Sequence, residues 1–224
     1  MHVAVIPARA GSVGLPGKNQ MFFDATADFI ASATWFSRTI VSTDDAVVAK
    51  KARERAFELR DRPEPLAGPA VPIKAVFADV IEAMDIDDDD LLWLFYLPIL
   101  HKNRADFEAA REIMEQREAN SLCAFVPART HPYSCWSFDA ERGRLCQYIP
   151  NDVFRRQDMA PAWSHHHYVA CFRASALASL NNELIGPRTY PYFLDAAAAA
   201  PLIEVDTPED LARWQARQAE PSQS

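Results

Sequence analysis

The stretch that decides the fold is HVAVIPARAGSVGLPGKN, residues 2–19. Residues 2–7 are a short apolar run with β-branched side chains that ends in a proline, which predicts a buried first strand. Three of the chain's six glycines follow within seven residues, as Gly11, Gly14 and Gly17. Because glycine permits positive φ and a close backbone approach, the amide groups of such a loop can point at an anion. Residues 2–19 therefore predict a strand that leads into a loop suited to phosphate.

Charged and polar side chains in this loop separate two interpretations of it. The glycines alone would also suit an ordinary tight turn between a strand and a helix. Arg9 and Lys18 add the positive charge that matches a phosphate ligand, and Asn19 adds a polar side chain beside them. These three residues favour phosphate binding over a simple turn.

The following sequence alternates between strand and helix patterns. Short apolar runs predict further strands at residues 39–41, 91–97, 121–126, 168–172 and 202–205. Helical periodicity and capping signals predict helices that end near residue 56, cover 73–84 and 104–117, and start after Thr207, where Pro208 suits the first helical position. Strands that alternate with helices predict an α/β domain with a mostly parallel sheet. We expect one such domain over residues 1–218, followed by a frayed polar tail at 219–224.

Residues 127–161 interrupt this alternation. They are rich in prolines and aromatic side chains, with two short segments that suit strands, and they fit neither the helical nor the strand period. We interpret the segment as an arm inserted into the domain. Its aromatic side chains are typical of an interface, although they could equally pack on their own domain: Trp136, Phe138, Tyr148 and Phe154.

The bulk composition excludes several classes of protein. A formal net charge of −8 argues against a general nucleic-acid binder, which needs a basic surface to displace counterions. No run reaches the roughly 18 apolar residues that a membrane span requires, and no basic and apolar leader opens the chain, so we expect a cytoplasmic protein without membrane contact. The four cysteines have no spacing typical of a zinc site, which favours reduced thiols.

Several motifs together resemble one known family. The stretch IPARAGSVGLPGKN at 6–19 is similar in order and position to the opening motif of CMP-acylneuraminate (CMP-sialic acid) synthetases. The similarity continues along nearly the whole chain, in VSTDD at 41–45, RPEPLA at 62–67, HPY at 131–133, RRQD at 155–158 and IEVDTPEDL at 203–211. CMP-Kdo synthetases share a similar loop, but STDD and RRQD favour the acylneuraminate branch. The chain thus resembles a divergent member of that family.

The resemblance implies a three-layer, Rossmann-like fold of the nucleotide-diphospho-sugar transferase type. It implies transfer of CMP from CTP to the anomeric hydroxyl of an acidic, nonulosonic-type sugar with release of pyrophosphate, dependence on Mg²⁺, and a homodimer. By this resemblance Arg9 and Lys18 are the catalytic residues. The implied nucleotide-binding residues are Ala8, Arg9, Gly11, Ser12, Gly14, Lys18 and Asn19.

The resemblance also places metal and sugar ligands. Glu204 and Asp206 match the family's paired metal-ligating aspartates, and their spacing puts both side chains on one side of an extended segment. Asp206 could instead be a simple helix cap. The predicted sugar-binding residues are Tyr96, Lys102, Arg156, Gln157 and His166. Arg156 could also be one of a surface arginine pair that bonds to acids.

Four departures from the family pattern leave the activity and the acceptor open. Val13 stands where a second lysine is usual, residues 96–102 lack the usual polar element, residues 164–167 read Ser-His-His-His in place of an arginine motif, and the segment 19–38 is short. Alternatives are therefore a non-catalytic relative with a structural or regulatory role, or a different nucleotide-sugar enzyme on the same fold. Because consecutive strand residues point to opposite faces, at most two of the three histidines could share a metal ion.

Overall fold

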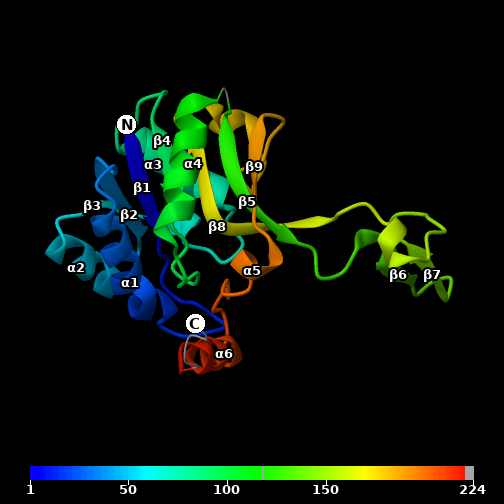
Figure 1. Cartoon of the computed structure of the whole chain (residues 1–224). Coiled ribbons are helices and arrows are strands. Elements are labelled where there is room, and N and C mark those ends of the chain that lie inside the picture. Colours follow the sequence, from blue (N-terminus) through cyan, green and yellow to red (C-terminus); the bar gives the residue numbers. More distant parts are fainter. Residues whose placement is uncertain (118, 220–224) are drawn as a thin grey trace.

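A seven-stranded sheet forms the centre of the computed structural model, which describes residues 1–117 and 119–219 (Figure 1). In spatial order the strands are β3 (Glu58–Asp61), β2 (Arg38–Thr43), β1 (His2–Pro7), β4 (Leu91–Leu94), β8 (Trp163–Arg173), β5 (Ser121–Pro127) and β9 (Thr189–Phe193). Strand β8 runs antiparallel to both of its neighbours, and the other neighbouring pairs are parallel. The prediction of a mostly parallel α/β sheet is confirmed.

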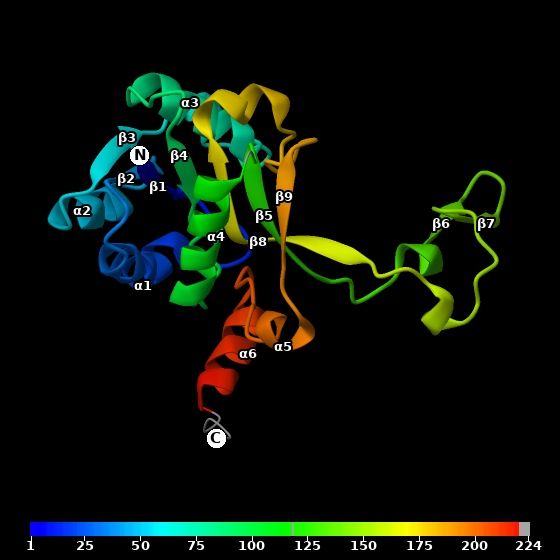
Figure 2. The ribbon, with the colours of Figure 1, turned by 45° about the horizontal axis from the view of Figure 1, so that its top comes forward.

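Helices cover both faces of the sheet and make the three predicted layers (Figure 2). Buried side chains of α1 (Lys18–Ser32), α2 (Ala46–Glu54) and α4 (Arg104–Gln116) pack on one face. Those of α3 (Ile73–Ala83) and the 3₁₀ helix η4 (Ala174–Ser179) pack on the other. Each helix is amphipathic and buries one apolar stripe against the sheet, so the sheet holds two separate cores.

An aromatic cluster fills the core beneath α1 and α4. Phe107 of α4 is 1% exposed and stacks on Phe95, with ring centroids 5.4 Å apart and an interplanar angle of 7°. It also contacts Phe29 of α1, at a centroid distance of 4.8 Å, and Tyr168 of β8 at 5.8 Å. Phe107 therefore joins two helices to the centre of the sheet.

Local capping explains where two helices begin. Asp45 caps α2, because its carboxylate accepts a hydrogen bond from the Val47 amide at 2.8 Å. Before α6 (Pro208–Ala219), the Asp210 amide donates to the Thr207 hydroxyl, and the Thr207 amide donates back to the Asp210 carboxylate at 3.0 Å. This reciprocal arrangement is a capping box, and it confirms the helix start predicted at Thr207.

Two predicted strands differ from those in the structure. The strand expected at 91–97 ends at Leu94, because the chain turns at Tyr96 and the Ile99 amide donates to the Tyr96 carbonyl. The prediction of a strand at residues 202–205 is wrong. In this segment Glu204 forms one isolated bridge with Ile99, since the turn that ends at Ile99 offers only a short edge to pair with.

Several elements have no counterpart in the sequence predictions, among them α1, β3 and β9. Helix α1 covers most of the segment 19–38, and it begins directly after Gly17, whose φ of 72° caps it. Strand β9 includes Pro191 and alternates poorly, yet it pairs in parallel with β5 at the sheet edge, where a missing amide is tolerated. A further short helix, α5 (Ala196–Ala199), is capped by the Asp195 carboxylate.

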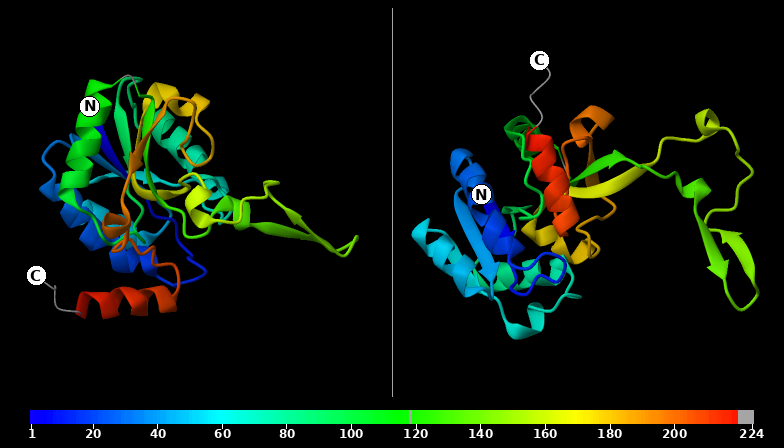
Figure 3. Two further views of the ribbon diagram at one scale, coloured as in Figure 1. Left: turned by 45° about the vertical axis from the view of Figure 1, so that its right-hand side comes forward. Right: turned by 90° about the horizontal axis from the view of Figure 1, so that it is seen from below.

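A long arm leaves the sheet between β5 and β8 and extends well away from it (Figure 3). It holds the hairpin β6 (Trp136–Asp139) and β7 (Arg144–Gln147), together with the 3₁₀ helices η2 (Pro132–Ser134) and η3 (Arg156–Asp158). Large apolar side chains on the arm are exposed, among them Phe138 at 65% and Phe154 at 88%. The arm thus presents an unpartnered aromatic surface in a single chain.

The end of the chain is described only in part. Of the tail predicted at 219–224, Ala219 is the last residue of α6, and residues 220–224 lie outside the described residues. Within the described ranges, no helix has the length and apolarity needed to cross a membrane.

Candidate functional site

The glycine-rich loop between β1 and α1 adopts the conformation that its glycines were predicted to allow. Gly11 and Gly17 have φ values of 68° and 72°, which are costly for other residues. A Cβ atom at Gly14 would lie 2.5 Å from the backbone oxygen of Asp206, so only glycine fits there. The loop is therefore bent by two of its glycines and pressed against the segment before α6 by the third.

Side chains of the STDD segment hold this loop in place. The Thr43 hydroxyl donates to the Ala8 carbonyl, and the Ala10 amide donates to the Asp44 carboxylate at 2.7 Å. At the other end of the loop, the side-chain amide of the buried Asn19 donates to the Arg9 carbonyl at 2.8 Å. Backbone groups of the loop are thus fixed from both sides before any ligand binds.

A cavity lies beside the loop and brings together side chains from distant parts of the chain. Of the predicted nucleotide-binding residues, it is lined by Arg9, Ser12, Lys18 and Asn19. Ala8 is fully buried beneath the loop, while Gly11 and Gly14 shape its backbone. The rest of the lining consists of Pro7, Arg62, Leu66, Gly68, Pro69, Val71, Ile73, Val76, Tyr96 and Pro98.

Arg62 is a cavity residue that the sequence predictions did not include, although the RPEPLA motif contained it. It is 8% exposed, and its guanidinium donates to the Ser42 hydroxyl at 3.2 Å and the Ser42 carbonyl at 2.8 Å. Burial is the main cause that lowers its pKa, but arginine stays protonated at neutral pH. Among the described residues no carboxylate lies within ion-pair distance of Arg62 or Arg9. Both cations are therefore available to an anionic ligand.

Lys18 lies between the cavity and the two predicted metal ligands. Its ammonium group pairs with the Asp206 carboxylate. Glu204 keeps part of its side chain open to solvent, yet protein atoms crowd its carboxylate, and this burial raises its pKa, followed by the nearby charge of Asp206. Lys18 is close enough to lower that pKa in turn. The structure thus brings both acids and the lysine together at the edge of the cavity.

A second cleft opens on the far side of Glu204. It is lined by His165 and His166 of β8, by Arg129 at the base of the arm, and by residues of α5 and α6 that include Arg213. Burial is the main cause that lowers the pKa of His166 to about 4, so its imidazole is neutral at pH 7. Of the predicted sugar-binding residues, His166 lies in this cleft and Tyr96 lies in the wall of the first.

The other three predicted sugar-binding residues lie elsewhere. Arg156 and Gln157 are on η3 in the arm, which extends away from the sheet (Figure 3), and neither residue lines the cavity. Lys102 is partly buried, and its ammonium group donates to the Thr26 hydroxyl at 3.0 Å and to the Ile99 carbonyl. These contacts turn Lys102 toward α1 and away from both clefts.

The burial of Lys102 predicts an unusual dependence of stability on pH. Burial lowers the pKa of its ammonium group to about 7, from 10.5 in an unfolded chain. Between these two pH values the unfolded state binds more protons, so the free energy of unfolding rises with pH, by at most about 1.4 kcal/mol per pH unit. We expect Lys102→Met to lose this rise in urea unfolding measured from pH 7 to 9.

An exposed lysine provides the matched control for this test. Lys50 is 76% exposed, so Lys50→Met should leave the pH profile of the wild type unchanged. Parallel profiles for the wild type and Lys102→Met would contradict the expectation.

The contact at Gly14 predicts a loss of stability on a minimal substitution. In Gly14→Ala the added methyl group meets a backbone oxygen that cannot rotate away, and overpacking of this kind costs about 1–3 kcal/mol. Gly68→Ala is the matched control, because its Cβ would meet only the Val71 side chain at an ordinary 3.5 Å. Urea unfolding measures both variants, and equal stabilities would show that the loop moves freely away from Asp206.

Solved structures that resemble the chain define its fold class. A CMP:2-keto-3-deoxy-manno-octonic acid synthetase complexed with CTP matches with a TM-score of 0.67 at 17% identity, over 97% of this chain and 98% of that chain. The 2-C-methyl-D-erythritol 4-phosphate cytidylyltransferase of Francisella tularensis matches with a TM-score of 0.62 at 13% identity, over 96% and 99%. The chain has the α/β fold of these nucleotidyltransferases, as the sequence resemblance implied.

Sequence similarity points to one group among proteins of this kind. The chain is 24% identical to the N-acylneuraminate cytidylyltransferase of Streptococcus agalactiae serotype V, over 218 residues and 93% of its length, and 23% identical to that of serotype III. It spans about half the length of these curated relatives, 51% in both cases. No model of a protein family matches the chain. The resemblance predicted from the motifs is thus confirmed as a weak but consistent similarity to N-acylneuraminate cytidylyltransferases.

Proposed function

We propose that the protein is a cytidylyltransferase, which transfers CMP from CTP to a hydroxyl group of an acidic, nonulosonic-type sugar and releases pyrophosphate. The observation that carries the proposal is the cavity beside the glycine-rich loop, where Arg9, Lys18 and Arg62 meet in a protein of net charge −8. Local positive charge in such a field suits a polyanionic ligand. The similarity to N-acylneuraminate cytidylyltransferases supports the nucleotide and the class of acceptor.

The residues of the cavity have different roles toward the triphosphate. The loop amides, the N-terminus of α1 and the Arg9 and Arg62 guanidinium groups bind the phosphate oxygens. Lys18, which already lies at the cavity edge, offsets the charge that develops on the leaving pyrophosphate as the acceptor hydroxyl attacks the α-phosphorus. Tyr96, whose pKa burial raises to about 12, stays protonated and can donate a hydrogen bond.

Glu204 and Asp206 are the residues that would hold Mg²⁺. Both supply carboxylate oxygens, the ligands this ion prefers, and both lie beside Lys18 at the edge of the cavity, so the donor set fits. When bound, the ion would offset the negative charge of the triphosphate and of the leaving pyrophosphate. Asp206 would serve both the ion and Lys18, whose ammonium group already pairs with its carboxylate.

We also propose that the arm completes the site of a second copy in a homodimer. Arg156 and Gln157 are not among the residues that line the cavity of their own chain, and the arm that carries them exposes aromatic side chains. Guanidinium groups bind carboxylates through paired hydrogen bonds, which suits an acidic sugar. Sedimentation analysis of the wild type against Phe138→Asp measures whether the arm holds two copies together.

A panel of acceptors tests the proposed reaction. Pyrophosphate release is measured with CTP and Mg²⁺ and one acceptor at a time: N-acetylneuraminate, legionaminate, pseudaminate, 2-keto-3-deoxy-manno-octonic acid, and 2-C-methyl-D-erythritol 4-phosphate. We expect turnover with a nonulosonic acid and formation of its CMP conjugate. Turnover with the phosphorylated polyol alone would assign a different acceptor class.

CTP binding, measured by calorimetry, separates the remaining outcomes. Binding without turnover would mean that the acceptor lies outside the panel. No binding of CTP would overturn the proposal in favour of a non-catalytic relative. The physical reason would be the exposed Val13 in the loop, which leaves the loop without a second cation at that position. Preference for a nucleoside diphosphate sugar would indicate another nucleotide-sugar enzyme.

A further inference from the structure

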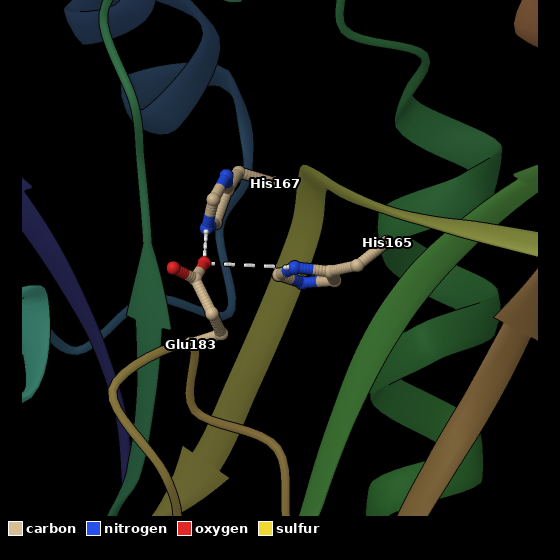
Figure 4. Close-up of side chains that lie close together, drawn as sticks. All are labelled: His165, His167 and Glu183. Carbon is tan, nitrogen blue, oxygen red and sulfur yellow. Dashed lines mark hydrogen bonds and ion pairs between the residues drawn. The ribbon is translucent and has the colours of Figure 1, made fainter. Parts of the chain in front are cut away.

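Three side chains next to the nucleotide cavity form a cluster that the proposed reaction does not use (Figure 4). His165 and His167 are two apart on β8, so their imidazoles lie on the same face, with ring centroids 4.5 Å apart. Glu183 reaches them from the loop between η4 and β9. Its Oε2 atom lies 2.8 Å from His167 Nε2 and 3.7 Å from His165 Nδ1.

His165 is the least satisfied member of this cluster. Its Nε2 atom is buried and has no hydrogen-bond partner among the described residues. Its Nδ1 atom lies too far from Glu183 for a hydrogen bond. A buried nitrogen atom without a hydrogen-bond partner is costly unless a further ligand satisfies the imidazole.

The loop that carries Glu183 is held firmly in position. The Asn181 side chain accepts hydrogen bonds from the Glu183 amide at 2.9 Å and the Ile185 amide at 3.0 Å. Between them Leu184 is buried and has a φ of 62°, a strained conformation for leucine. Strain of this kind persists where the surrounding structure fixes a functional geometry. The Glu183 side chain itself is 56% exposed, so its carboxylate can adjust to a ligand.

We propose that His165, His167 and Glu183 bind a divalent transition-metal ion of the zinc class. Two imidazoles and one carboxylate are the donor set that such ions prefer, and Mg²⁺ does not. The three ligand atoms lie within 4.8 Å of one another, and around a zinc ion they would be roughly 3.3 Å apart. Rotation of the exposed Glu183 side chain can widen its 2.8 Å contact with His167 and shorten its 3.7 Å distance to His165. The exposed side of the cluster leaves a coordination position open.

The position of the cluster gives the ion a role at the acceptor side of the site. The His167 ring contacts the Tyr96 ring, with centroids 4.8 Å apart, and Tyr96 lines the nucleotide cavity. His165 lines the neighbouring cleft. The ion would lie between the cavity and the cleft, with one side chain separating it from the cavity and one of its own ligands lining the cleft. It would bind whether or not the protein transfers CMP, so the two proposals can fail separately.

Cobalt titration of the full chain tests the site. The protein is stripped with a chelator, dialysed and titrated with Co²⁺, and the visible absorption of bound cobalt is recorded with no nucleotide present; Zn²⁺ is then added to displace it. We expect one Co²⁺ per chain at micromolar concentration. Loss of groups that merely orient metal ligands weakens binding by about 10- to 100-fold, so Glu183→Gln and His167→Gln should each weaken it by at least about tenfold.

Two control variants locate the ion. His166→Gln changes the neighbouring histidine, which is not a member of the cluster and whose Nδ1 atom accepts a hydrogen bond from the Tyr168 amide, so it should keep the wild-type affinity and spectrum. Asp206→Asn should also keep them, since it removes an acid of the other predicted site. Glu183 is exposed, so its variant should fold, which its melting temperature verifies. Equal cobalt binding by the wild type and Glu183→Gln, or none by the wild type, would overturn the proposal.

Discussion

Replacing Lys18 with alanine is expected to lower CTP-dependent pyrophosphate release by about 100- to 1,000-fold, as for the loss of one group that stabilises developing charge. The physical reason is that Lys18 contacts two parts of the site. It lines the cavity proposed to bind the nucleotide, and it pairs with Asp206, one of the two acids that would hold Mg²⁺. The rate is measured with the best acceptor of the panel at saturating CTP.

The stability of the Lys18 variant separates a catalytic effect from a folding effect. Asp206 keeps 48% of its side chain exposed, so it stays hydrated when its partner is removed. Exposed ion pairs of this type contribute about 1 kcal/mol or less, and the free energy of unfolding should change little. Lys50→Ala, at an exposed position of α2, is the matched control and should keep full turnover. Full turnover in Lys18→Ala would remove the loop from the proposed mechanism.

Replacing Phe107 with alanine is expected to lower the free energy of unfolding by about 3–5 kcal/mol. The ring is buried between α4, α1 and the sheet, where it stacks on Phe95 and contacts Phe29, so its removal leaves a cavity that rigid neighbours cannot fill. Urea unfolding at neutral pH gives the value. Phe107→Leu should lose less, because it keeps most of the buried volume.

An exposed residue on the same layer serves as the control. Met21 of α1 is 52% exposed, and Met21→Ala should change the free energy of unfolding by only about 0.5 kcal/mol. A loss at Phe107 no larger than at Met21 would mean that the aromatic cluster relaxes around the gap.

The fold was predictable where local pattern and tertiary structure agree. The first strand, its glycine loop and the capped helices after Asp45 and Thr207 carry signals within a few residues of each other. Helix α1 was missed because its first turn has no acidic side chain or capping side chain, and its start depends on Gly17 alone. The strand expected at 202–205 failed for the opposite reason: its apolar pattern was correct, but Ile99 offers it only one bridge.

The residues of the candidate site also differ in whether a local pattern or only the tertiary structure brings them together. Arg9, Lys18 and Asn19 are close in sequence, and the loop that holds them was recognisable from its glycines. Arg62 joins them only because β3 runs parallel to β2, which carries Ser42 and so fixes the guanidinium. The pairing of Glu183 with His167 depends on a loop 16 residues further along the chain. Contacts of this sort follow from topology and leave no periodic signal.

The contact between the glycine loop and Asp206 has a consequence for the order in which the protein matures. Lys18 and Asp206 are separated by 188 residues, and Gly14 rests on the same late segment. Chains grow from the N-terminus at about 5–20 residues per second, so the loop leaves the ribosome long before the residues that press on it. The proposed nucleotide site therefore cannot be completed during synthesis until the segment before α6 has emerged.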